Sequence, residues 1–282
     1  MSIVVTGATG QLGRLAVEAL LERGVPAAEV VATGRRTEVL ADLAARGVVV
    51  RHADYDDVTS LKAAFDGAER LLLVSGSEVG QRVHQHGDAV AAAQAAGVGF
   101  VAYTSIVRAD TSTLLLAEEH RATEQLLAEA GVPHALLRNS WYVENYTGQL
   151  PVHLAHGIAG AAGDGAVSAA TRADYAAAAA AVLATDGHAG AVYELGGAPF
   201  TMTELAEVVS AATGRTVTYT DLPVEEYTQV LVAAGIPEAF AAVYADGDRG
   251  VADGELFVDT GHLDKLIGRT PTSLEEAVRA AA

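Results

Sequence analysis

The segment that most restricts the fold is VVTGATGQLGRL, residues 4–15, where glycines follow a run of β-branched residues and open a helical pattern. The glycines are Gly7, Gly10 and Gly13. Glycine at a first strand-to-helix turn allows a tight bend and lets backbone N–H groups approach a pyrophosphate. The spacing is Gly-x-x-Gly-x-x-Gly, so its position directly after a strand carries the interpretation. We expect a dinucleotide site here, with a purely structural turn as the alternative.

Continuous apolar runs alternate with helical patterns through the first half of the chain. Strands are expected at residues 3–6, 30–33, 48–50, 71–74, 100–103 and 135–137. Runs without in-and-out alternation, separated by helices, are typical of a parallel sheet that is covered on both faces. The sequence therefore predicts a doubly wound α/β fold.

The pattern changes after residue 150. A glycine-rich loop leads to an alanine-rich helix from about Ala173, and a short strand is expected at residues 192–195. Thr-x-x-Glu sequences at residues 201–204 and 272–275 predict capping boxes, which begin helices. We expect one domain over residues 1–150 and a smaller, mostly helical C-terminal lobe over residues 151–282. Elements at about 185–197 should return to the first domain.

Composition excludes several classes of function. The 282 residues include 36 acidic and 18 basic side chains, a formal charge of −18 that repels nucleic acid and anionic lipid. No apolar run is long enough to cross a membrane, and residues 1–5 lack the pattern of a signal peptide. The absence of cysteine excludes disulfides and thiolate chemistry and fits the cytoplasm. The histidines show no metal-ligand spacing, so no metal site is expected.

Two arginines follow the second expected strand, where an acidic residue would accept hydrogen bonds from the ribose of NAD. Arg35 and Arg36 instead suit a 2′-phosphate, which favours NADP(H) over NAD(H). The alternative is a pair of solvated arginines. Asp54, after the third expected strand, could contact the adenine amino group. A helix-capping or solvated role stays open for each carboxylate of this stretch, Asp54, Asp56 and Asp57.

The proton relay of short-chain dehydrogenases is missing. That relay is Tyr-x-x-x-Lys on the helix after the fifth strand, whereas LAEEHRATE at residues 116–124 has no tyrosine and places His120 at the lysine position. Ser105 would have no tyrosine to assist. We therefore expect a substrate that accepts hydride without a positioned acid, such as a quinone, whose reduced product water can protonate. A role for His120 and a plain polar position on the helix stay open.

Hydrolysis by a serine nucleophile is disfavoured, because the Gly-x-Ser-x-Gly elbow is absent. The nearest match, VSGS at residues 74–77, follows the fourth expected strand and is assigned to cofactor contact. The sequence NSWY at residues 139–142 follows the sixth strand, where open α/β sheets place ligands. Its amide and flat aromatic rings suit a quinone or a nicotinamide, with core packing as the alternative.

Together, TGATGQLG, LLLVSGSEVGQR, AYTSI, LAEEHRATE and LRNSWYVENY resemble the NmrA-like atypical short-chain dehydrogenases. Within this family the chain is most similar to the bacterial NADPH-dependent quinone oxidoreductase type. The resemblance implies a Rossmann domain with a small C-terminal domain, NADPH along the strand ends, and a small-molecule quinone in the cleft between the domains. It leaves two alternatives: reduction of cationic triphenylmethane dyes, for which Glu144 is a candidate carboxylate, and NADP sensing without turnover. A homodimer is compatible with the sequence.

The resemblance also assigns residues. Cofactor binding is expected from Thr6, Gly7, Gly10, Gln11, Leu12, Arg35, Arg36, Asp54, Ser75 and Thr104. Within this set, Gly7 to Leu12 would hold the pyrophosphate and Arg35 the 2′-phosphate. Arg36 is a second phosphate candidate, and Ser75 and Thr104 would line the path to the nicotinamide. Asn139 and Trp141 would border the substrate cleft, and His120 is the remaining candidate there.

Overall fold

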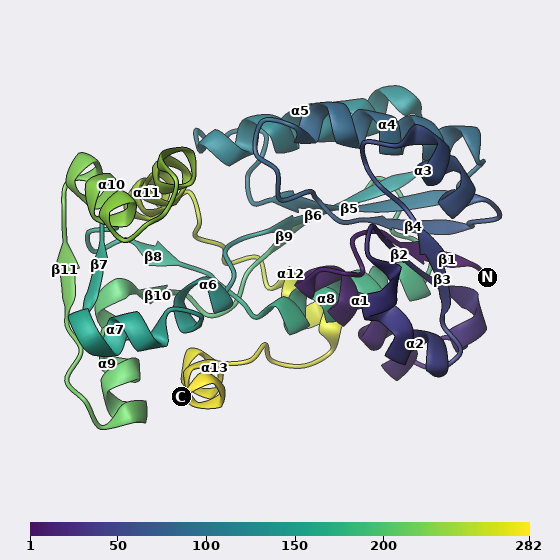
Figure 1. Cartoon of the computed structure of the whole chain (residues 1–282). Helices are drawn as coiled ribbons and strands as arrows, with labels where there is room; N and C mark the ends of the chain where they lie inside the picture. Colours follow the sequence, from purple (N-terminus) through teal and green to yellow (C-terminus); the bar gives the residue numbers. More distant parts are fainter.

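The central sheet is parallel and has seven strands in the order β3-β2-β1-β4-β5-β6-β9 (Figure 1). The computed structural model describes residues 1–282. The strands are β1 (Ile3–Val5), β2 (Val30–Gly34), β3 (Val49–His52), β4 (Arg70–Leu73), β5 (Phe100–Ile106), β6 (His134–Asn139) and β9 (Val192–Leu195). This confirms the doubly wound α/β fold.

Helices cover both faces of the sheet (Figure 1). One face carries α1 (Gln11–Glu22), α8 (Arg172–Ala184) and α12 (His262–Ile267), with η1 (Ala27–Glu29), η2 (Thr37–Leu40) and α2 (Ala41–Ala45) beside them. The other face carries α3 (Val58–Phe65), α4 (Arg82–Ala95) and α5 (Leu115–Ala130). The alanine-rich α8 packs closely on α1, because its small side chains let the two backbones approach.

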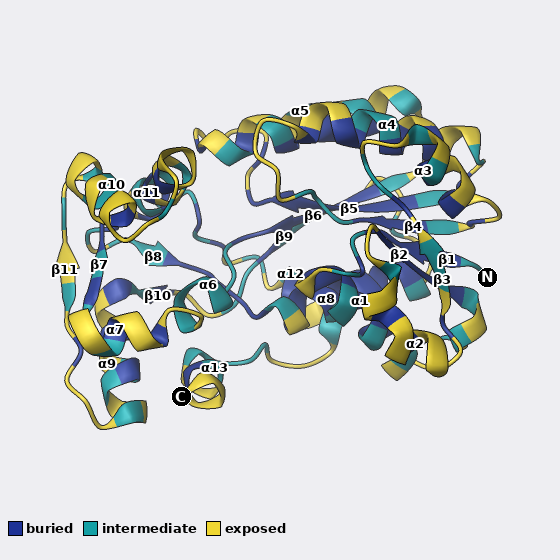
Figure 2. Ribbon diagram, in the orientation of Figure 1, coloured by how far each residue is buried: buried dark blue, intermediate teal, exposed yellow.

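Burial follows strand position in the sheet (Figure 2). All of β1 and β2 is buried, because helices cover both faces of these strands. The edge strand β3 is half-buried or exposed along its length. The expectation of a continuously buried run is therefore wrong for this strand, which has a neighbour on one side only.

The remaining elements form a second lobe beside the sheet (Figure 1). They are α6 (Glu144–Thr147), α7 (Leu150–His156), β7 (Ile158–Gly160), β8 (Ala166–Val167), β10 (Phe200–Thr201), α9 (Met202–Thr213), β11 (Tyr219–Asp221), α10 (Val224–Ala233), α11 (Glu238–Ala252) and α13 (Leu274–Ala281). Strands β8 and β10 pair antiparallel, and β7 pairs parallel with β11. This lobe is mostly helical, as expected.

Strand β9 leaves the second half of the chain and pairs with β6 in the central sheet. It lies within the segment of about 185–197 for which a return to the first domain is expected. The division into domains at residues 1–150 and 151–282 stays a prediction.

Of the two expected capping boxes, one lies where it was predicted and the other is shifted by one residue. Thr201 caps α9 through a full capping box with Glu204, as predicted. The second box is formed by Ser273 and Glu276, one residue later than predicted. Both registers fit the pattern in TPTSLEEA, and the N–H of Thr272 instead donates to an oxygen of Asp174 at 2.9 Å.

A buried ion network joins the ends of the last three strands of the sheet. The guanidinium of Arg138 on β6 donates to both oxygens of Glu124 on α5, at 2.9 and 2.7 Å. It also donates to Asp110 at 3.0 Å and to Glu194 on β9 at 2.9 Å. Ser105 on β5 donates to Glu124 at 2.6 Å, so its hydroxyl belongs to this network.

None of the helices is long and apolar enough to span a bilayer.

Candidate functional site

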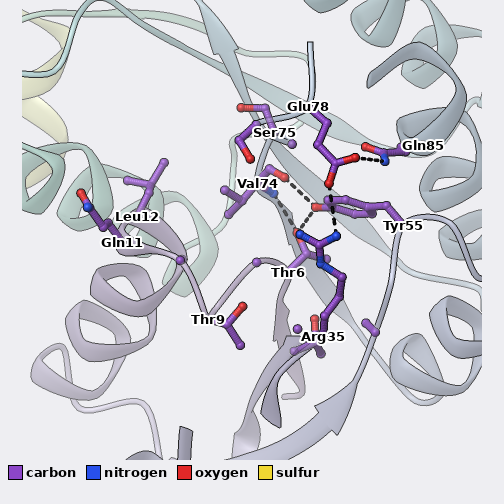
Figure 3. A pocket seen from close by; sticks show the side chains of 18 of the residues that line it. Thr6, Thr9, Gln11, Leu12, Arg35, Tyr55, Val74, Ser75, Glu78 and Gln85 are labelled. Carbon is purple, nitrogen blue, oxygen red and sulfur yellow. Dashed lines mark hydrogen bonds and ion pairs between the residues drawn. The ribbon is translucent and has the colours of Figure 1, made fainter. Parts of the chain in front are cut away.

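A cavity of about 460 Å³ lies at the carboxyl ends of β1, β2 and β4 (Figure 3). The chain winds outward from β1 in both directions, so this is the point where an open parallel sheet forms its ligand crevice. Eight of the expected cofactor residues line it: Thr6, Gly7, Gly10, Gln11, Leu12, Arg35, Asp54 and Ser75. The turns after four strands therefore meet around one space.

The glycine turn after β1 brings the backbone close to helix α1. Gly7 has φ +60°, a left-handed conformation that glycine adopts without strain. A Cβ at Gly13 would lie 2.4 Å from the carbonyl oxygen of Gly7, so only glycine fits there. Gly10 is the N-cap of α1, and no side chain caps this end and no acidic residue lies in its first turn. The first N–H groups of the helix are thus available to an anion in the cavity.

The two arginines after β2 lie in different places. Arg35 lines the cavity and pairs with Glu78 across it at 3.2 Å (Figure 3). Arg36 is exposed at the start of η2 and does not line the cavity. Because successive residues point in different directions along an extended segment, only the first faces the pocket.

Asp54 lines the cavity, but it does not cap a helix. The cap of α3 is Asp57, which accepts hydrogen bonds from the N–H groups of Thr59 and Ser60. Asp54 accepts from the N–H of Asp56 within its own turn. The capping alternative is therefore confirmed for Asp57 and wrong for Asp54.

Tyr55 is a cavity residue that the sequence reasoning missed. Its buried hydroxyl donates to the carbonyl of Val74 at 2.6 Å and lies 2.7 Å from the hydroxyl of Thr6, which ties the turn after β3 to those after β1 and β4 (Figure 3). Burial raises the pKa of Tyr55 above its ordinary value, so the phenol stays protonated. No motif could have revealed this role, because Tyr55 stands in an acidic stretch that reads as solvated.

The loop after β4 is held by buried side chains. The N–H of Ser75 donates to the hydroxyl of Thr104, which is 2% exposed and lies behind the cavity wall rather than in it. The N–H of Gly76 donates to Nε2 of His86 at 3.0 Å, and Nδ1 of His86 contacts the hydroxyl of Thr123 at 2.9 Å. Burial lowers the pKa of His86 to about 3, so the ring stays neutral and Nε2 remains an acceptor.

The second half of the chain adds one wall of the cavity. Tyr142 follows β6 and forms a β-bridge with Ala170. This bridge brings Arg172, at the start of α8, over the ring of Tyr142, and the guanidinium lies 4.4 Å from the ring centroid. Tyr142 and Arg172 both line the cavity. Glu144 accepts from the N–H of Arg172 at 2.9 Å and pairs with its guanidinium at 3.4 Å. Its negative charge is therefore already engaged.

The three candidates for the substrate side do not line this cavity. Trp141 points to the other side of the extended segment from Tyr142 and packs against Gly247 on α11. Asn139 is 4% exposed, and its buried Oδ1 has no hydrogen-bond partner. His120 is buried on α5, where Nδ1 lies 2.7 Å from the hydroxyl of Tyr103. Burial lowers its pKa well below the ordinary value. Because His120 is 6% exposed, the alternative of a polar residue on a partly exposed helix face is wrong.

The structure holds no group of three or more histidine, aspartate or glutamate side chains that could bind a metal ion.

The chain matches curated relatives over nearly its full length. It is 49% identical over 278 residues to quinone oxidoreductase 2 of Escherichia coli (strain K12). The alignment covers 98% of this chain and 97% of that protein.

Two crystal structures are closely similar. The NADPH-dependent quinone oxidoreductase of Escherichia coli complexed with NADPH has a TM-score of 0.96 and 48% identity, with 99% of each chain covered. The Citrobacter sp. triphenylmethane reductase complexed with NADP(H) has a TM-score of 0.94 and 39% identity, with 100% of each chain covered. The sequence model of the NmrA-like family matches residues 1–276. The chain therefore belongs to the NmrA-like family.

Proposed function

We propose that this protein is an NADPH-dependent oxidoreductase that reduces quinones by direct hydride transfer. The observation that carries the proposal is the cavity at the carboxyl ends of β1 and β2, which joins an uncapped helix N-terminus to an arginine. It occurs in a chain 48% identical to an NADPH-dependent quinone oxidoreductase whose structure holds NADPH.

The residues present fit NADPH. Because Gly13 has no Cβ, the backbone of the turn at Gly7 packs directly against α1, and the N-terminus of this helix offers N–H groups to the pyrophosphate. Arg35 supplies a guanidinium fork for a 2′-phosphate, and no carboxylate stands at the end of β2 to bind a ribose hydroxyl instead. Within the glycine turn, Gly7 to Leu12 hold the pyrophosphate.

The reaction requires positioning rather than acid catalysis. When bound, NADPH supplies a hydride to the acceptor. Ser75, fixed by Thr104, and Tyr142, held under Arg172, form the two sides of the inner cavity where a flat ring can be oriented. The residues at 1–150 bind the cofactor, and the lobe at 151–282, with Asn139 and Trp141 at its border, shapes the acceptor site. The reduced quinone oxygen takes its proton from water, since the buried His120 and Ser105 are engaged elsewhere.

The alternative function, reduction of cationic triphenylmethane dyes, is less well supported on electrostatic grounds. The candidate carboxylate Glu144 is paired with Arg172, and the guanidinium of Arg172 lines the cavity. Because Glu144 is engaged by Arg172, a cationic dye finds no unpaired carboxylate at this wall, whereas the N–H groups of Arg172 can donate to a developing phenolate. A sensor that only binds NADP would gain nothing from this inner wall.

The test follows the absorbance of reduced nicotinamide in the purified protein, with NADPH and NADH in parallel. The acceptors are a benzoquinone, a naphthoquinone and one cationic triphenylmethane dye. We expect rapid NADPH oxidation with the quinones. Turnover of the dye alone would move the protein to the dye reductases, and tight NADPH binding with no turnover by any acceptor would make it a sensor.

Replacing Arg35 with alanine should weaken NADPH binding by about 1.5–3 kcal/mol, or roughly 10- to 150-fold, because a charged hydrogen bond to the 2′-phosphate is lost. NADH, which lacks this phosphate, should bind almost as before. The measurement is isothermal titration calorimetry with each cofactor.

Arg36→Ala is the matched comparison, because Arg36 has the same charge and does not line the cavity. We expect a smaller loss for this variant, and an equal loss would give Arg36 the role of second phosphate ligand. If Arg35→Ala lowered the affinity for NADPH and NADH equally, the assignment of Arg35 would be wrong.

We further propose a cytoplasmic enzyme, which the absence of cysteine supports. A homodimer stays a prediction, and the mass of the protein in solution tests it.

A further inference from the structure

The guanidinium that should hold the 2′-phosphate already has a carboxylate partner. Nη1 of Arg35 lies 3.2 Å from Oε1 of Glu78 (Figure 3). Arg35 follows β2 and Glu78 follows β4, and these strands flank β1 in the sheet. The ion pair therefore crosses the crevice above the end of β1, where the glycine turn lies.

Glu78 is held toward the cavity by a buried side chain. Its other oxygen, Oε2, accepts from Nε2 of Gln85 on α4 at 3.4 Å. Gln85 is 3% exposed and also donates to Oδ1 of Asp56 at 3.1 Å, so its amide has a fixed position. All three partners, Arg35, Glu78 and Gln85, line the same cavity. The two oxygens of Glu78 thus have separate partners, Arg35 and Gln85, which orient the carboxylate toward the cavity.

Glu78 occupies one edge of the Arg35 guanidinium through a single contact, from Oε1 to Nη1. A 2′-phosphate that takes this edge must displace the carboxylate, and two anions that share one guanidinium at this distance repel each other. We infer that Glu78 competes with the 2′-phosphate of the cofactor for Arg35 and so sets the affinity for the phosphorylated cofactor. This inference rests on the proposed function, because it requires that Arg35 bind the 2′-phosphate.

The competition by Glu78 lowers the affinity for cofactors that carry the 2′-phosphate. Opening the Arg35–Glu78 pair opposes binding of NADPH and of its oxidised product alike, so Glu78 favours cofactor release. NADH brings no group that needs Arg35, and for it the pair can stay closed. Both side chains are about half exposed, 60% for Arg35 and 45% for Glu78, so water screens the pair and the effect is moderate.

The test is the variant Glu78→Gln, which keeps the side-chain length and an amide oxygen that can accept from Gln85. We expect the dissociation constant for NADPH, measured by calorimetry at low salt, to fall about three- to fivefold, and that for NADH to change less than about twofold. At high salt the gain for NADPH should shrink, because screening weakens the pair.

Two further variants make the result specific. In the Arg35→Ala background, Glu78→Gln should raise the NADPH affinity less than it does in the unaltered protein, since the competition for the guanidinium is gone and only the screened repulsion between carboxylate and phosphate remains. Glu38→Gln, at an exposed carboxylate of η2 that does not line the cavity, controls for the change in net charge and should have no such effect.

The outcomes separate the two proposals. If the unaltered protein fails to bind NADPH, the proposed function is wrong. If it binds NADPH and Glu78→Gln leaves that affinity unchanged, weakens it, or strengthens NADH equally, the competition by Glu78 is overturned.

Discussion

Replacing Gly13 with alanine should abolish high-affinity NADPH binding and destabilise the fold by about 1–3 kcal/mol, the usual cost of forcing an extra methyl group into filled space. The added Cβ would lie 2.4 Å from the carbonyl oxygen of Gly7, 2.6 Å from its carbonyl carbon and 2.9 Å from the nitrogen of Ala8. These are all backbone atoms, so no side-chain rotation relieves the overlap. Either the turn or helix α1 must move, and the N–H groups at the N-terminus of α1 then no longer point toward the pyrophosphate.

Gly87→Ala is the matched control. Gly13 and Gly87 both lie within helices, where alanine is ordinarily favoured over glycine by up to about 1 kcal/mol. A Cβ at Gly87 would meet only Cδ1 of Leu126, at an ordinary 3.7 Å. Urea unfolding should show opposite signs for the two variants, and calorimetry should show unchanged NADPH binding for Gly87→Ala alone. A Gly13→Ala protein that is stable and binds NADPH normally would contradict the proposed role of the turn.

Replacing Arg138 with methionine should lower the free energy of unfolding by about 3–5 kcal/mol, because it leaves a buried carboxylate without its partner. Glu124 is 9% exposed and accepts two hydrogen bonds from Arg138, and Glu194 accepts a third. Methionine fills much of the same space but carries no charge. The measurement is urea unfolding at neutral pH.

Two controls separate the lost charge from lost packing. Adding Glu124→Gln to Arg138→Met removes the stranded charge, so the double variant should be more stable than Arg138→Met alone. Arg14→Met breaks the exposed ion pairs of Arg14 with Glu18, at 3.3 Å, and with Asp42, and should cost about 1 kcal/mol or less, because water screens both pairs. Equal losses for Arg138→Met and Arg14→Met would show that burial of the network contributes nothing.

The sheet and the glycine turn were predictable because their signals are local. Each strand from β1 to β6 contains a short apolar run, and the glycines stand immediately after the first strand. Arg35 could be placed because the end of β2 has a fixed position relative to β1 in this fold. In each case a few neighbouring residues determine the local structure.

The rest of the site depends on contacts between distant segments. Trp141 and Tyr142 are adjacent and both aromatic, and only the bridge between Tyr142 and Ala170 decides which of them faces the cavity. His86 and Tyr55 act through hydrogen bonds to backbone groups of the loop after β4, which no spacing reveals. Sequence reasoning therefore selected Trp141 where the cavity presents Tyr142.

The small sheets of the second lobe were missed for a related reason. Strands β7, β8, β10 and β11 are two or three residues long, and each pairs with a segment far along the chain. Runs this short carry no periodicity.

The pairing of β9 with β6 bears on how such proteins can be recombined. Because the last strand of the cofactor-binding sheet is encoded after the segment that builds part of the second lobe, a single crossover near residue 150 cannot exchange one half for another cleanly. A chimera made there would join β6 of one parent to β9 of the other and would have to match their register from Leu136 with Val192 to Asn139 with Leu195. It would also place the Glu194 of one parent against the Arg138 of the other. The second lobe is therefore better exchanged as the segments on both sides of β9, while that strand stays with its native sheet.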